Sequence, residues 1–310
     1  MVGSLGNEVM TVESHSGMTL RGQYLQWHHG VANVAYLLIM HAILLGWLWY
    51  GRLLVPYVGF VGLSLLACLI YQRILSEWFH EATHWNLVAN RTWSDRLADL
   101  LIGPFNGTRV KHNRPAHFRH HAVIEFFTPD DPDTDKAAAT NREEMIRGIL
   151  RDLSGRTAIE AFLSAIRAGT TRENNGVGGD LVWFFWLALI HGAGLYVTFG
   201  AGYFEIYPIY FISLLTLYPV ANRLRLYVQH AWVGEDGSIS LAHSRASRTF
   251  FANPIEQLIL SSPMIMYHHE HHVAPSLPYR ALRAMAKPSD DPNVFSTRPF
   301  RLIGKALVGL

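Results

Sequence analysis

The chain has 310 residues, of which 50% are hydrophobic and 16% are charged. A formal net charge of +2 is too small to indicate nucleic-acid binding. The single cysteine, Cys68, excludes an intrachain disulfide and any four-cysteine iron–sulfur or zinc site. It lies in an apolar run, where a free cysteine is expected to pack as a small hydrophobic residue. Residues 1–30 show no apolar stretch of the kind that a signal peptide needs.

Long apolar stretches predict an all-α membrane protein with four transmembrane helices. At a rise of about 1.5 Å per residue, twenty helical residues cover the ~30 Å hydrocarbon core of a bilayer. The expected spans are residues 31–50, 53–72, 181–199 and about 203–220. Because very few residues separate the first span from the second, or the third from the fourth, the spans should form two helical hairpins. We expect a single membrane-embedded domain over residues 1–310, with the bulky remainder forming a helical cap on one side.

Positive charge predicts which side that is. Of the 26 Lys and Arg residues, 13 fall in residues 85–179 and 10 in residues 221–310, whereas Arg52 lies in a hairpin tip on the opposite face. An excess of Lys and Arg marks the cytoplasmic side of a membrane protein. We therefore expect cytosolic segments at 73–180 and 221–310, both termini in the cytosol, and a location in the cell membrane.

Three segments of the expected cap have distinct compositions. Thr128–Asp135 (TPDDPDTD) is an acidic, proline-broken loop, and Asp130, Asp131 and Asp133 are expected to be solvated, with direct ligation of a metal or support of a metal ligand as the alternatives. Residues 141–167 have apolar residues at helical spacing and predict an amphipathic surface helix. Residues 169–179 are rich in Gly, Asn and Thr and predict a flexible link back to the membrane.

Histidines form three clusters with helical spacing. His80 and His84 lie in the motif HEATH, at the end of the second expected span. The motif HxxHH occurs twice, and its histidines are His117, His120 and His121, and then His268, His271 and His272. Residues i, i+3 and i+4 share one face of a helix, so each cluster presents two or three neutral nitrogen donors in one direction. This is the arrangement that a metal site requires.

The expected topology places all three clusters on the same side of the membrane. No span separates the first cluster from the second, and two spans separate the second from the third. His230 lies about two turns beyond the end of the fourth span, which is the same level relative to the membrane as His80 and His84. A shared metal site is the simplest explanation of this agreement.

These motifs resemble the three histidine boxes of the membrane fatty acid desaturase and hydroxylase superfamily. HEATH, HFRHH and HHEHH occur in the family's order, DPD follows the second box, and Pro275 and Pro278 follow the third. The resemblance covers residues 30–285. Three residues separate the histidines of the first box, where acyl-CoA desaturases often have four, and this favours the acyl-lipid, hydroxylase or ketolase-like branches.

The resemblance implies a non-haem di-iron enzyme that uses O₂, and it implies the ligands. Two irons are bound by the boxes together with one further histidine that precedes the third box. The implied ligands are His80, His84, His117, His120, His121, His230, His268, His271 and His272. The implied reaction is desaturation of a fatty acyl chain or a related lipid-like substrate, with hydroxylation or ketone formation on a lipid or isoprenoid as the alternative. Both outcomes use the same ligands.

Electrons for such a reaction must come from another protein. The sequence has no CxxC cluster, no haem-binding module and no flavin-type glycine-rich stretch. We expect a separate ferredoxin or small cytochrome as the donor, with an acidic surface that docks on a basic patch. The candidate patch residues are Arg109, Lys111, Arg114 and Arg119.

The remaining histidines have simpler expected roles. His15, His28, His29 and His243 are expected to face solvent, and His112 and His269 to support the boxes or the scaffold. His41 and His191 lie inside spans, where a neutral histidine usually bonds to a neighbouring helix. Glu81 and Glu270 are candidates to accept the second N–H of a ligating histidine.

Two other classes of protein remain open from the sequence. HEATH also matches the HExxH signature of zinc proteases, in which Glu81 would activate water. That interpretation leaves both HxxHH clusters unexplained. A non-catalytic metal-binding or transport protein would need ligands within the membrane, and only His41, His191 and Glu205 are available.

Overall fold

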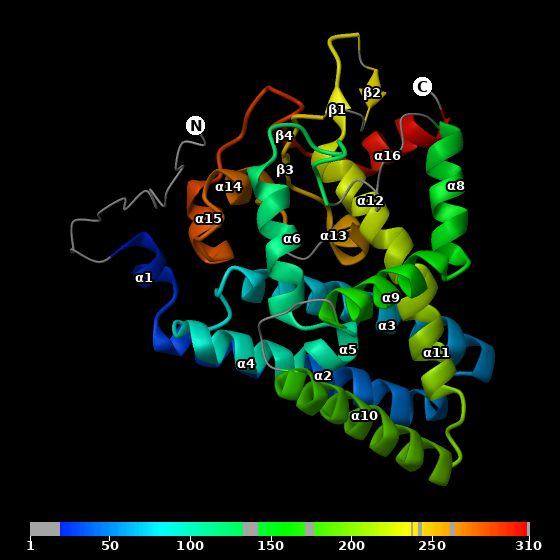
Figure 1. The fold of residues 1–310 in the computed structure, drawn as a ribbon. Helices are drawn as coiled ribbons and strands as arrows, with labels where there is room; N and C mark the ends of the chain where they lie inside the picture. Colours follow the sequence, from blue (N-terminus) through cyan, green and yellow to red (C-terminus); the bar gives the residue numbers. More distant parts are fainter. Residues whose placement is uncertain are drawn as a thin grey trace.

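The structure is a computed structural model, and it describes residues 19–132, 142–170, 177–236, 238–240, 244–260 and 264–308. Three long helices form the base of the molecule, at the bottom of Figure 1. They are α2 (Trp27–Tyr50), α3 (Tyr57–Thr83) and α10 (Val177–Gly200). Each contains a stretch that is long and apolar enough to cross a membrane. They correspond to the first three predicted spans.

The first hairpin differs from its prediction at the tip. After α2, the chain makes a short 3₁₀ turn, η1 (Gly51–Leu53), and α3 begins only at Tyr57, after Pro56. The residue before a proline avoids helical dihedrals, so the helix cannot start at Leu53 as predicted. At its other end, α3 continues beyond Gln72 to Thr83. The first histidine box therefore ends the same rigid helix that forms the second span.

Much of the long-helix surface is apolar and exposed. On α10, the side chains of Leu181, Phe185 and Tyr196 are between 63% and 83% exposed. Exposed apolar faces of this extent are unfavourable in water and are typical of surfaces that contact lipid. Neighbouring helices contact α10 closely at Gly194, where an added Cβ would lie 2.1 Å from the Tyr207 hydroxyl oxygen.

The region of the fourth predicted span is helical, but its helix is interrupted. It consists of α11 (Ile206–Ile212), a π-helical turn η2 (Ser213–Leu217) and α12 (Tyr218–His230). The π turn precedes Pro219, which has no N–H to donate to the helical ladder. Ser213 fixes the turn to α3, because its hydroxyl donates to Gln72 Oε1 at 3.1 Å. A membrane crossing by this segment stays a prediction.

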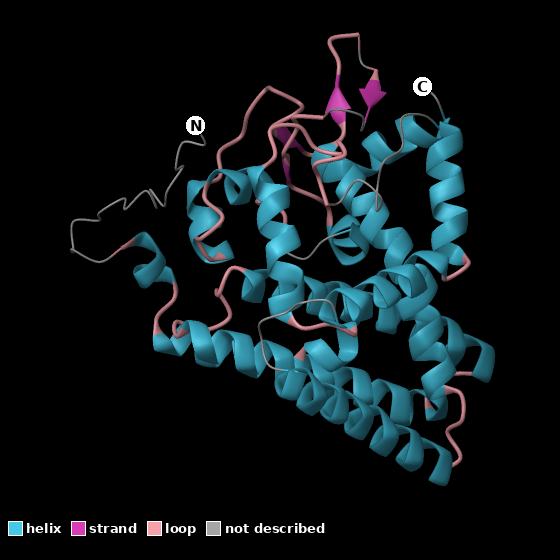
Figure 2. Ribbon diagram, viewed as in Figure 1, coloured by secondary structure: helices cyan, strands magenta, loops and turns pink. Residues whose placement is uncertain are grey.

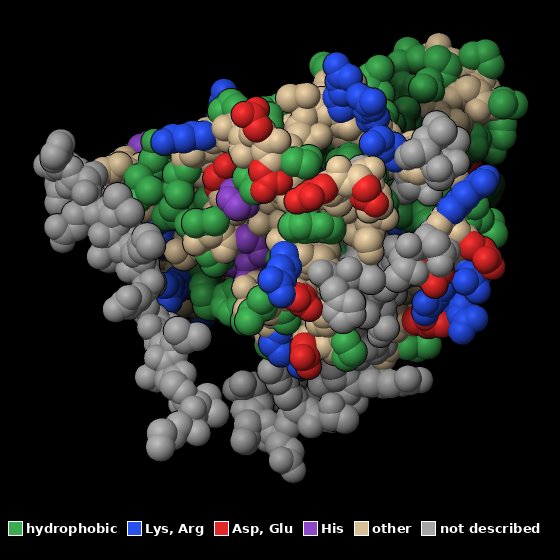
Figure 3. Space-filling view, turned by 90° about the horizontal axis from the view of Figure 1, so that it is seen from above, with side chains coloured by type: hydrophobic (Ala, Val, Ile, Leu, Met, Phe, Trp, Pro, Cys, Tyr) green, Lys and Arg blue, Asp and Glu red, His purple; other side chains and the backbone are tan. Residues whose placement is uncertain are grey.

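Most of the remaining elements form a mostly helical cap above the long helices, whereas the two helices within residues 91–106 pack beside α3 (Figures 1 and 2). The further helices are α1 (Leu20–Tyr24), α4 (Arg91–Leu101), α5 (Gly103–Asn106), α6 (Val110–Ala122), α8 (Arg142–Leu153), α9 (Arg156–Thr170), α13 (Pro254–Leu260), α14 (His268–Val273), α15 (Tyr279–Met285) and α16 (Pro299–Val308). The short strands are β1 (Trp232–Val233), β2 (Ile239–Ser240), β3 (Thr249–Phe250) and β4 (Phe295–Ser296). β1 pairs with β2 antiparallel, and β3 pairs with β4 parallel. Seen from above, the cap carries acidic and basic side chains among hydrophobic ones (Figure 3).

The prediction of a single amphipathic helix over residues 141–167 was wrong. The structure has two helices, α8 and α9, separated at Gly155, whose φ of 77° is left-handed. Nor is α8 confined to a surface: its Asp152 is buried and accepts hydrogen bonds from Arg223 of α12 at 2.6 and 3.0 Å. Most of the predicted link at residues 169–179 lies outside the described residues.

The histidines within the base bond across helices, as predicted. His41 of α2 lies with its Nε2 2.9 Å from the carbonyl oxygen of Leu101 in α4. His191 of α10 lies with its Nε2 2.9 Å from the carbonyl oxygen of Pro104 in α5. These bonds connect the long helices to the segment that leads into the second histidine box. Cys68 is fully buried, as expected.

Candidate metal centre

The first two histidines lie where α3 ends. His80 is in the last turn of α3, and His84 is its C-cap residue. The next residue, Trp85, has a φ of 59°, so the chain leaves the helix direction immediately after the box. The rings of His80 and His84 meet edge to face, with centroids 5.2 Å apart. The end of α3 thus presents two imidazoles side by side.

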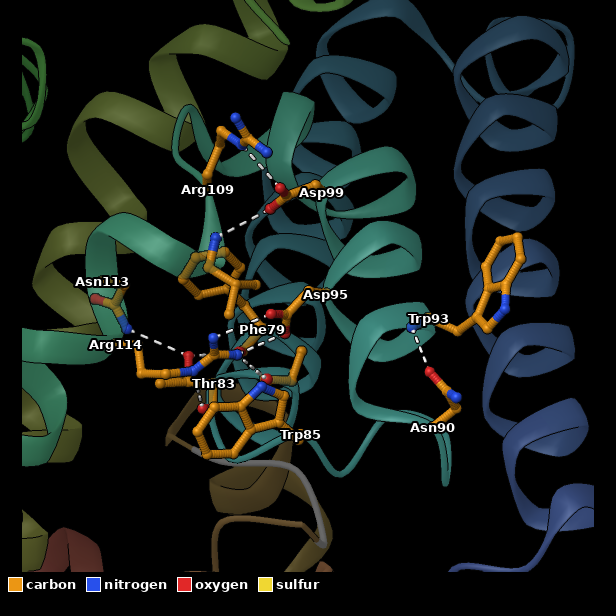
Figure 4. A network of polar contacts seen from close by, with 12 residues as sticks. Phe79, Thr83, Trp85, Asn90, Trp93, Asp95, Asp99, Arg109, Asn113 and Arg114 are labelled. Carbon is orange, nitrogen blue, oxygen red and sulfur yellow. Dashed lines mark hydrogen bonds and ion pairs between the residues drawn. The ribbon is translucent and has the colours of Figure 1, made fainter. Parts of the chain in front are cut away.

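Ion pairs between α4 and α6 hold the second box against the first (Figure 4). The Arg114 guanidinium donates to both carboxylate oxygens of Asp95, at 3.0 and 2.6 Å, and to the carbonyl oxygen of Thr83 at 2.8 Å. Asp99 of α4 accepts hydrogen bonds from two residues at the start of α6, namely from the Arg109 side chain and the Val110 backbone N–H. These contacts fix α6 against both α4 and the end of α3, so that the second box faces the first.

The third box is carried by α14, a helix of six residues. On one side of this helix, the Thr249 hydroxyl of β3 donates to the Glu270 carboxylate, and the His269 backbone N–H donates to the Thr249 oxygen at 3.2 Å. His268, His271 and His272 are then available to the other boxes. His230, the last residue of α12, lies beside them, with its Nε2 2.8 Å from that of His268.

The nine predicted ligands come together in two groups. The five-histidine group consists of His80, His84, His117, His121 and His271, whose nearest ring nitrogens all lie within 4.8 Å of one another. Ring nitrogens of His120, His230 and His272 meet the same limit. His268 joins these three because its Nε2 lies 2.8 Å from that of His230 and 3.1 Å from that of His272. These four form the four-histidine group.

Distances within the groups fit metal coordination. In the five-histidine group, the Nε2 atom of His117 lies 2.8 Å from that of His84 and 3.0 Å from that of His121. The Nε2 atom of His121 is in turn 2.9 Å from that of His271. Two nitrogens at right angles around an ion, each about 2.1 Å from it, are about 3.0 Å apart. A ring nitrogen offers either one lone pair or one N–H, so a shared cation satisfies such convergent nitrogens better than hydrogen bonds among themselves.

The imidazoles are also held in the form that binds a metal. Burial, together with the neighbouring imidazoles, lowers the pKa of His117, His271 and His84 well below its ordinary value. The same causes lower the pKa of His268 and His272. Neutral imidazole has the free lone pair that coordination needs.

Comparison with known protein families identifies the family of this chain. A family model, Fatty acid desaturase, matches residues 54–293. The chain belongs to this family. No curated protein matches the chain.

Two of the predicted ligands are oriented through their second ring nitrogen. Nδ1 of His120 lies 2.9 Å from Asp131 Oδ1, and Nδ1 of His230 lies 2.9 Å from the carbonyl oxygen of Ala246. A proton on Nδ1 that is donated to these oxygens leaves the Nε2 lone pair for a metal. Both supported ligands belong to the four-histidine group.

Asp131 corrects the prediction that the acidic loop is solvated. The side chain is buried, and its second oxygen accepts from the Phe127 backbone N–H at 2.8 Å. Its contact with His120 Nδ1 matches the alternative, support of a predicted ligand. Asp130 is exposed, as predicted, while Asp133 and Asp135 lie outside the described residues. The sequence signal was the DPD motif after the second box, which composition alone could not separate from a surface loop.

The two box glutamates contact the scaffold instead of a ligating histidine, contrary to prediction. Glu81 Oε2 accepts from the Tyr279 backbone N–H at 3.2 Å, and Glu270 accepts from Thr249. His269 is structural, as predicted: its Nδ1 lies 3.1 Å from the carbonyl oxygen of Ser247. His29 is half-buried rather than solvent-facing, since its Nδ1 accepts from the Gln26 backbone N–H at the start of α2.

Other spare histidines have simpler positions. His28 is exposed, as predicted, and His112 is half-buried within α6. His15 and His243 lie outside the described residues. None of these joins the two groups among the residues that the structure describes.

A cavity of about 220 Å³ adjoins both groups. Its histidines are His80 and His117 from the five-histidine group, and His120, His230 and His268 from the four-histidine group. The other walls come from α3, the segment from the end of α5 into α6, the π turn, α12 and the segment before α14. These residues are Ser76, Phe79, Asn106, Thr108, Asn113, Ala116, Leu214, Tyr218, Asn222, Arg225, Leu226 and Ile265. The cavity therefore lies directly beside histidines of both groups.

Proposed function

We propose that this protein is an O₂-dependent, non-haem di-iron desaturase with an acyl or lipid-like substrate. The observation that carries the proposal is the convergence of nine histidines into two groups with Nε2 separations of 2.8 to 3.1 Å. Each group would hold one iron. The irons would supply the activation of O₂ and the cleavage of an unactivated C–H bond.

The protein's own residues position the reactants. The cavity would place a substrate beside both groups. The Nδ1 bonds of His120 and His230 hold these two rings in one orientation. Loss of two hydrogens from the substrate gives an alkene. Hydroxylation is the alternative outcome on the same ligands.

The exposed apolar helices support a location in a membrane. We propose that the segment from α11 to α12 is the fourth span and that the cap, with the metal groups, faces the cytosol together with both termini. An external ferredoxin or small cytochrome would dock on this side. Arg109 and Arg114 are engaged by Asp99 and Asp95, so Arg119, which is exposed, is the best candidate in the basic patch to meet an acidic carrier.

The zinc-protease interpretation is not favoured by these contacts. The glutamate that would activate water, Glu81, is buried and bonded to the Tyr279 backbone. His80 and His84 also share their group with three further histidines, where a protease of this class binds zinc with two histidines and one further ligand.

Iron content and product mass test the proposal together. The purified protein is expected to contain about two irons per chain. Expressed with a ferredoxin and its reductase, it should produce molecules lighter by two hydrogens or heavier by one oxygen. The variant His120→Ala should abolish this change, while His28→Ala, which alters an exposed histidine outside both groups, should not. Full activity in His120→Ala, or zinc in place of iron, would contradict the proposal.

A further inference from the structure

The ring of Phe126 packs against three of the four rings in the four-histidine group. Its centroid lies 4.2 Å from that of His230, 5.0 Å from that of His272 and 5.1 Å from that of His120. The Phe126 side chain is buried, and it is not among the residues that line the cavity. It therefore covers this group on a side other than the one that faces the cavity.

The five-histidine group has no such cover among the described residues. Of the aromatic side chains other than histidine, only Phe118 contacts a ring of this group, with its centroid 5.3 Å from that of His84. Phe118 is 37% exposed, so it stays in contact with solvent. A buried phenyl ring against several ligands is thus particular to the four-histidine group.

Two chain segments pair with each other at Phe126. Its backbone N–H donates to the carbonyl oxygen of Ser244 at 2.7 Å, in an antiparallel bridge. The Ser244 hydroxyl donates to the carbonyl oxygen of His230 and accepts from the Ala246 backbone N–H at 3.1 Å. The carbonyl oxygen of Ala246 is the one that orients the His230 ring. The bridge therefore joins Phe126 to the segment that holds one of the ligands it covers.

The next residue joins Phe126 to the support of His120. Phe127 has a φ of 58°, a left-handed value that bulky residues rarely adopt. Asp131 stabilises this conformation, because it accepts from the Phe127 N–H through one carboxylate oxygen while the other lies against His120 Nδ1. The covering ring and the oxygens that orient both ligands are thus one connected unit. We call its two segments, residues 125–131 and 244–246, the clasp.

An ion pair joins the two segments of the clasp at the surface. Arg245 donates to Glu125 Oε1 from Nε and Nη2, at 3.0 and 2.6 Å. The side chains of Arg245 and Glu125 are 65% and 32% exposed, so solvent screening keeps the pair weak. A weak surface contact between segments with few regular backbone hydrogen bonds favours local opening, without unfolding of the helices.

From these contacts we propose that Phe126 is a positioning residue that excludes water from the four-histidine group and so retains the iron bound there, and that the Glu125–Arg245 pair keeps it closed. A space beside three imidazoles is polar enough to hold water, which competes with ring nitrogens for the metal. Opening of the clasp also withdraws the oxygens that orient His120 and His230, which weakens both as ligands. This inference rests on the proposed function, which supplies the iron, and adds how one of the two irons is kept.

Release of iron to a chelator tests the role of Phe126. The iron-loaded protein in lipid nanodiscs is reduced and mixed with excess ferrozine, and absorbance follows the iron that leaves. In Phe126→Ala, one iron per chain should leave at least about ten-fold faster than in the unaltered protein, while the other keeps its rate. Phe126→Leu, which preserves part of the packing, should give an intermediate rate. Phe60→Ala, which changes a fully buried phenylalanine near the other end of α3, is the matched control and should keep both rates.

Exchange of charge tests the ion pair. Glu125→Arg and Arg245→Glu should each speed the release of the same iron by about two- to five-fold, as expected for an exposed pair. The double variant restores the pair with reversed charges and should return to slow release. Because neither side chain contacts the histidines directly in the ion pair, restoration by the double variant identifies closure of the clasp as the cause.

The outcomes separate this inference from general destabilisation and from the proposed function. Unchanged release in Phe126→Ala and Phe126→Leu overturns the inference, as does equal acceleration of both irons in Phe126→Ala and Phe60→Ala. Fast release in the double variant overturns the role of the ion pair. Iron content is measured on the unaltered protein: about two irons whose release does not depend on Phe126 sinks only this inference, whereas absence of iron sinks the proposed function.

Discussion

The two histidine groups differ in how their rings are held and in how many of these rings line the cavity. In the four-histidine group, two ligands are oriented by Asp131 and by the Ala246 carbonyl, and three of the four rings line the cavity. In the five-histidine group, two of the five rings line it, and the rings are packed mainly against one another. The difference indicates a division between the groups: the four-histidine group has the oriented rings and the larger share of the cavity lining, and three of its four rings are buried, whereas three of the five rings in the five-histidine group are half-buried.

Removing one histidine from each group should have the largest effect and tests most directly whether the two groups hold a metal differently. His230→Ala leaves three imidazoles in the four-histidine group. His84→Ala leaves four in the five-histidine group, which is as many as the intact four-histidine group contains. We expect His230→Ala to lower metal affinity by more than about 100-fold, beyond the usual loss for a ligand's hydrogen-bond partner. Iron per chain, measured by mass spectrometry, should fall to about one in His230→Ala. The decrease should be smaller in His84→Ala. Equal loss in both variants would contradict the division.

Both groups contain buried histidines that are neutral in the folded protein, so the stability of both should depend on pH. The pKa of His84, His117 and His268, as of His271 and His272, is lowered in the folded protein. Below about pH 6.5 the unfolded chain takes up protons that the folded chain does not. Stability should therefore be fully present above pH 6.5 and fall as the pH drops below it, by up to about 1.4 kcal/mol per pH unit for each proton.

Thermal unfolding of the metal-free protein between pH 7.5 and 5.0 measures this dependence. His117→Gln removes one of the titrating rings and should flatten the slope. Bound iron holds the rings neutral, so the iron-loaded protein should lose stability only at lower pH. A melting temperature that does not change over this range would show that the burial of these rings has no such cost.

Asp131→Asn should lower the metal affinity of the four-histidine group alone. The substitution keeps the shape of the side chain but removes the charge that makes His120 a stronger ligand. We expect metal affinity of the four-histidine group to fall about 10- to 100-fold. Asp130→Asn changes the exposed neighbour and is the matched control. Iron titration followed by absorbance measures both, and an equal effect of the two variants would assign no role to Asp131.

Arg114→Met should have the smallest effect of the four, and it acts on the five-histidine group. The substitution removes the ion pair with Asp95 and the hydrogen bonds to the end of α3. Since Asp95 is 34% exposed, solvent screening reduces the contribution of the pair, and we expect a loss of about 1–2 kcal/mol. Arg96→Met, which changes an exposed arginine on α4 next to Asp95, is the control. Unfolding in detergent measures the difference, and the prediction fails if both variants are equally stable.

Several features of the fold could be predicted from the sequence because they depend on neighbours along the chain. Apolar runs of twenty residues gave the three long helices, and the i, i+3 and i+4 spacing gave histidines on shared helix faces. Breaks were harder to predict: the start of α3 at Tyr57 and the left-handed Gly155 between α8 and α9 depend on single residues within otherwise periodic patterns.

The sequence by itself determined which nine histidines could bind metal, but only the tertiary structure decided how they are divided. The second box gives His117 and His121 to the five-histidine group and His120 to the four-histidine group. The third box does the reverse, giving His268 and His272 to the four-histidine group and His271 to the other. Helical spacing fixes only that the residues of one box share a face. Their partners depend on how α3, α6, α12 and α14 dock, and side chains distant in the sequence, such as Arg114, Asp95 and Thr249, set that docking.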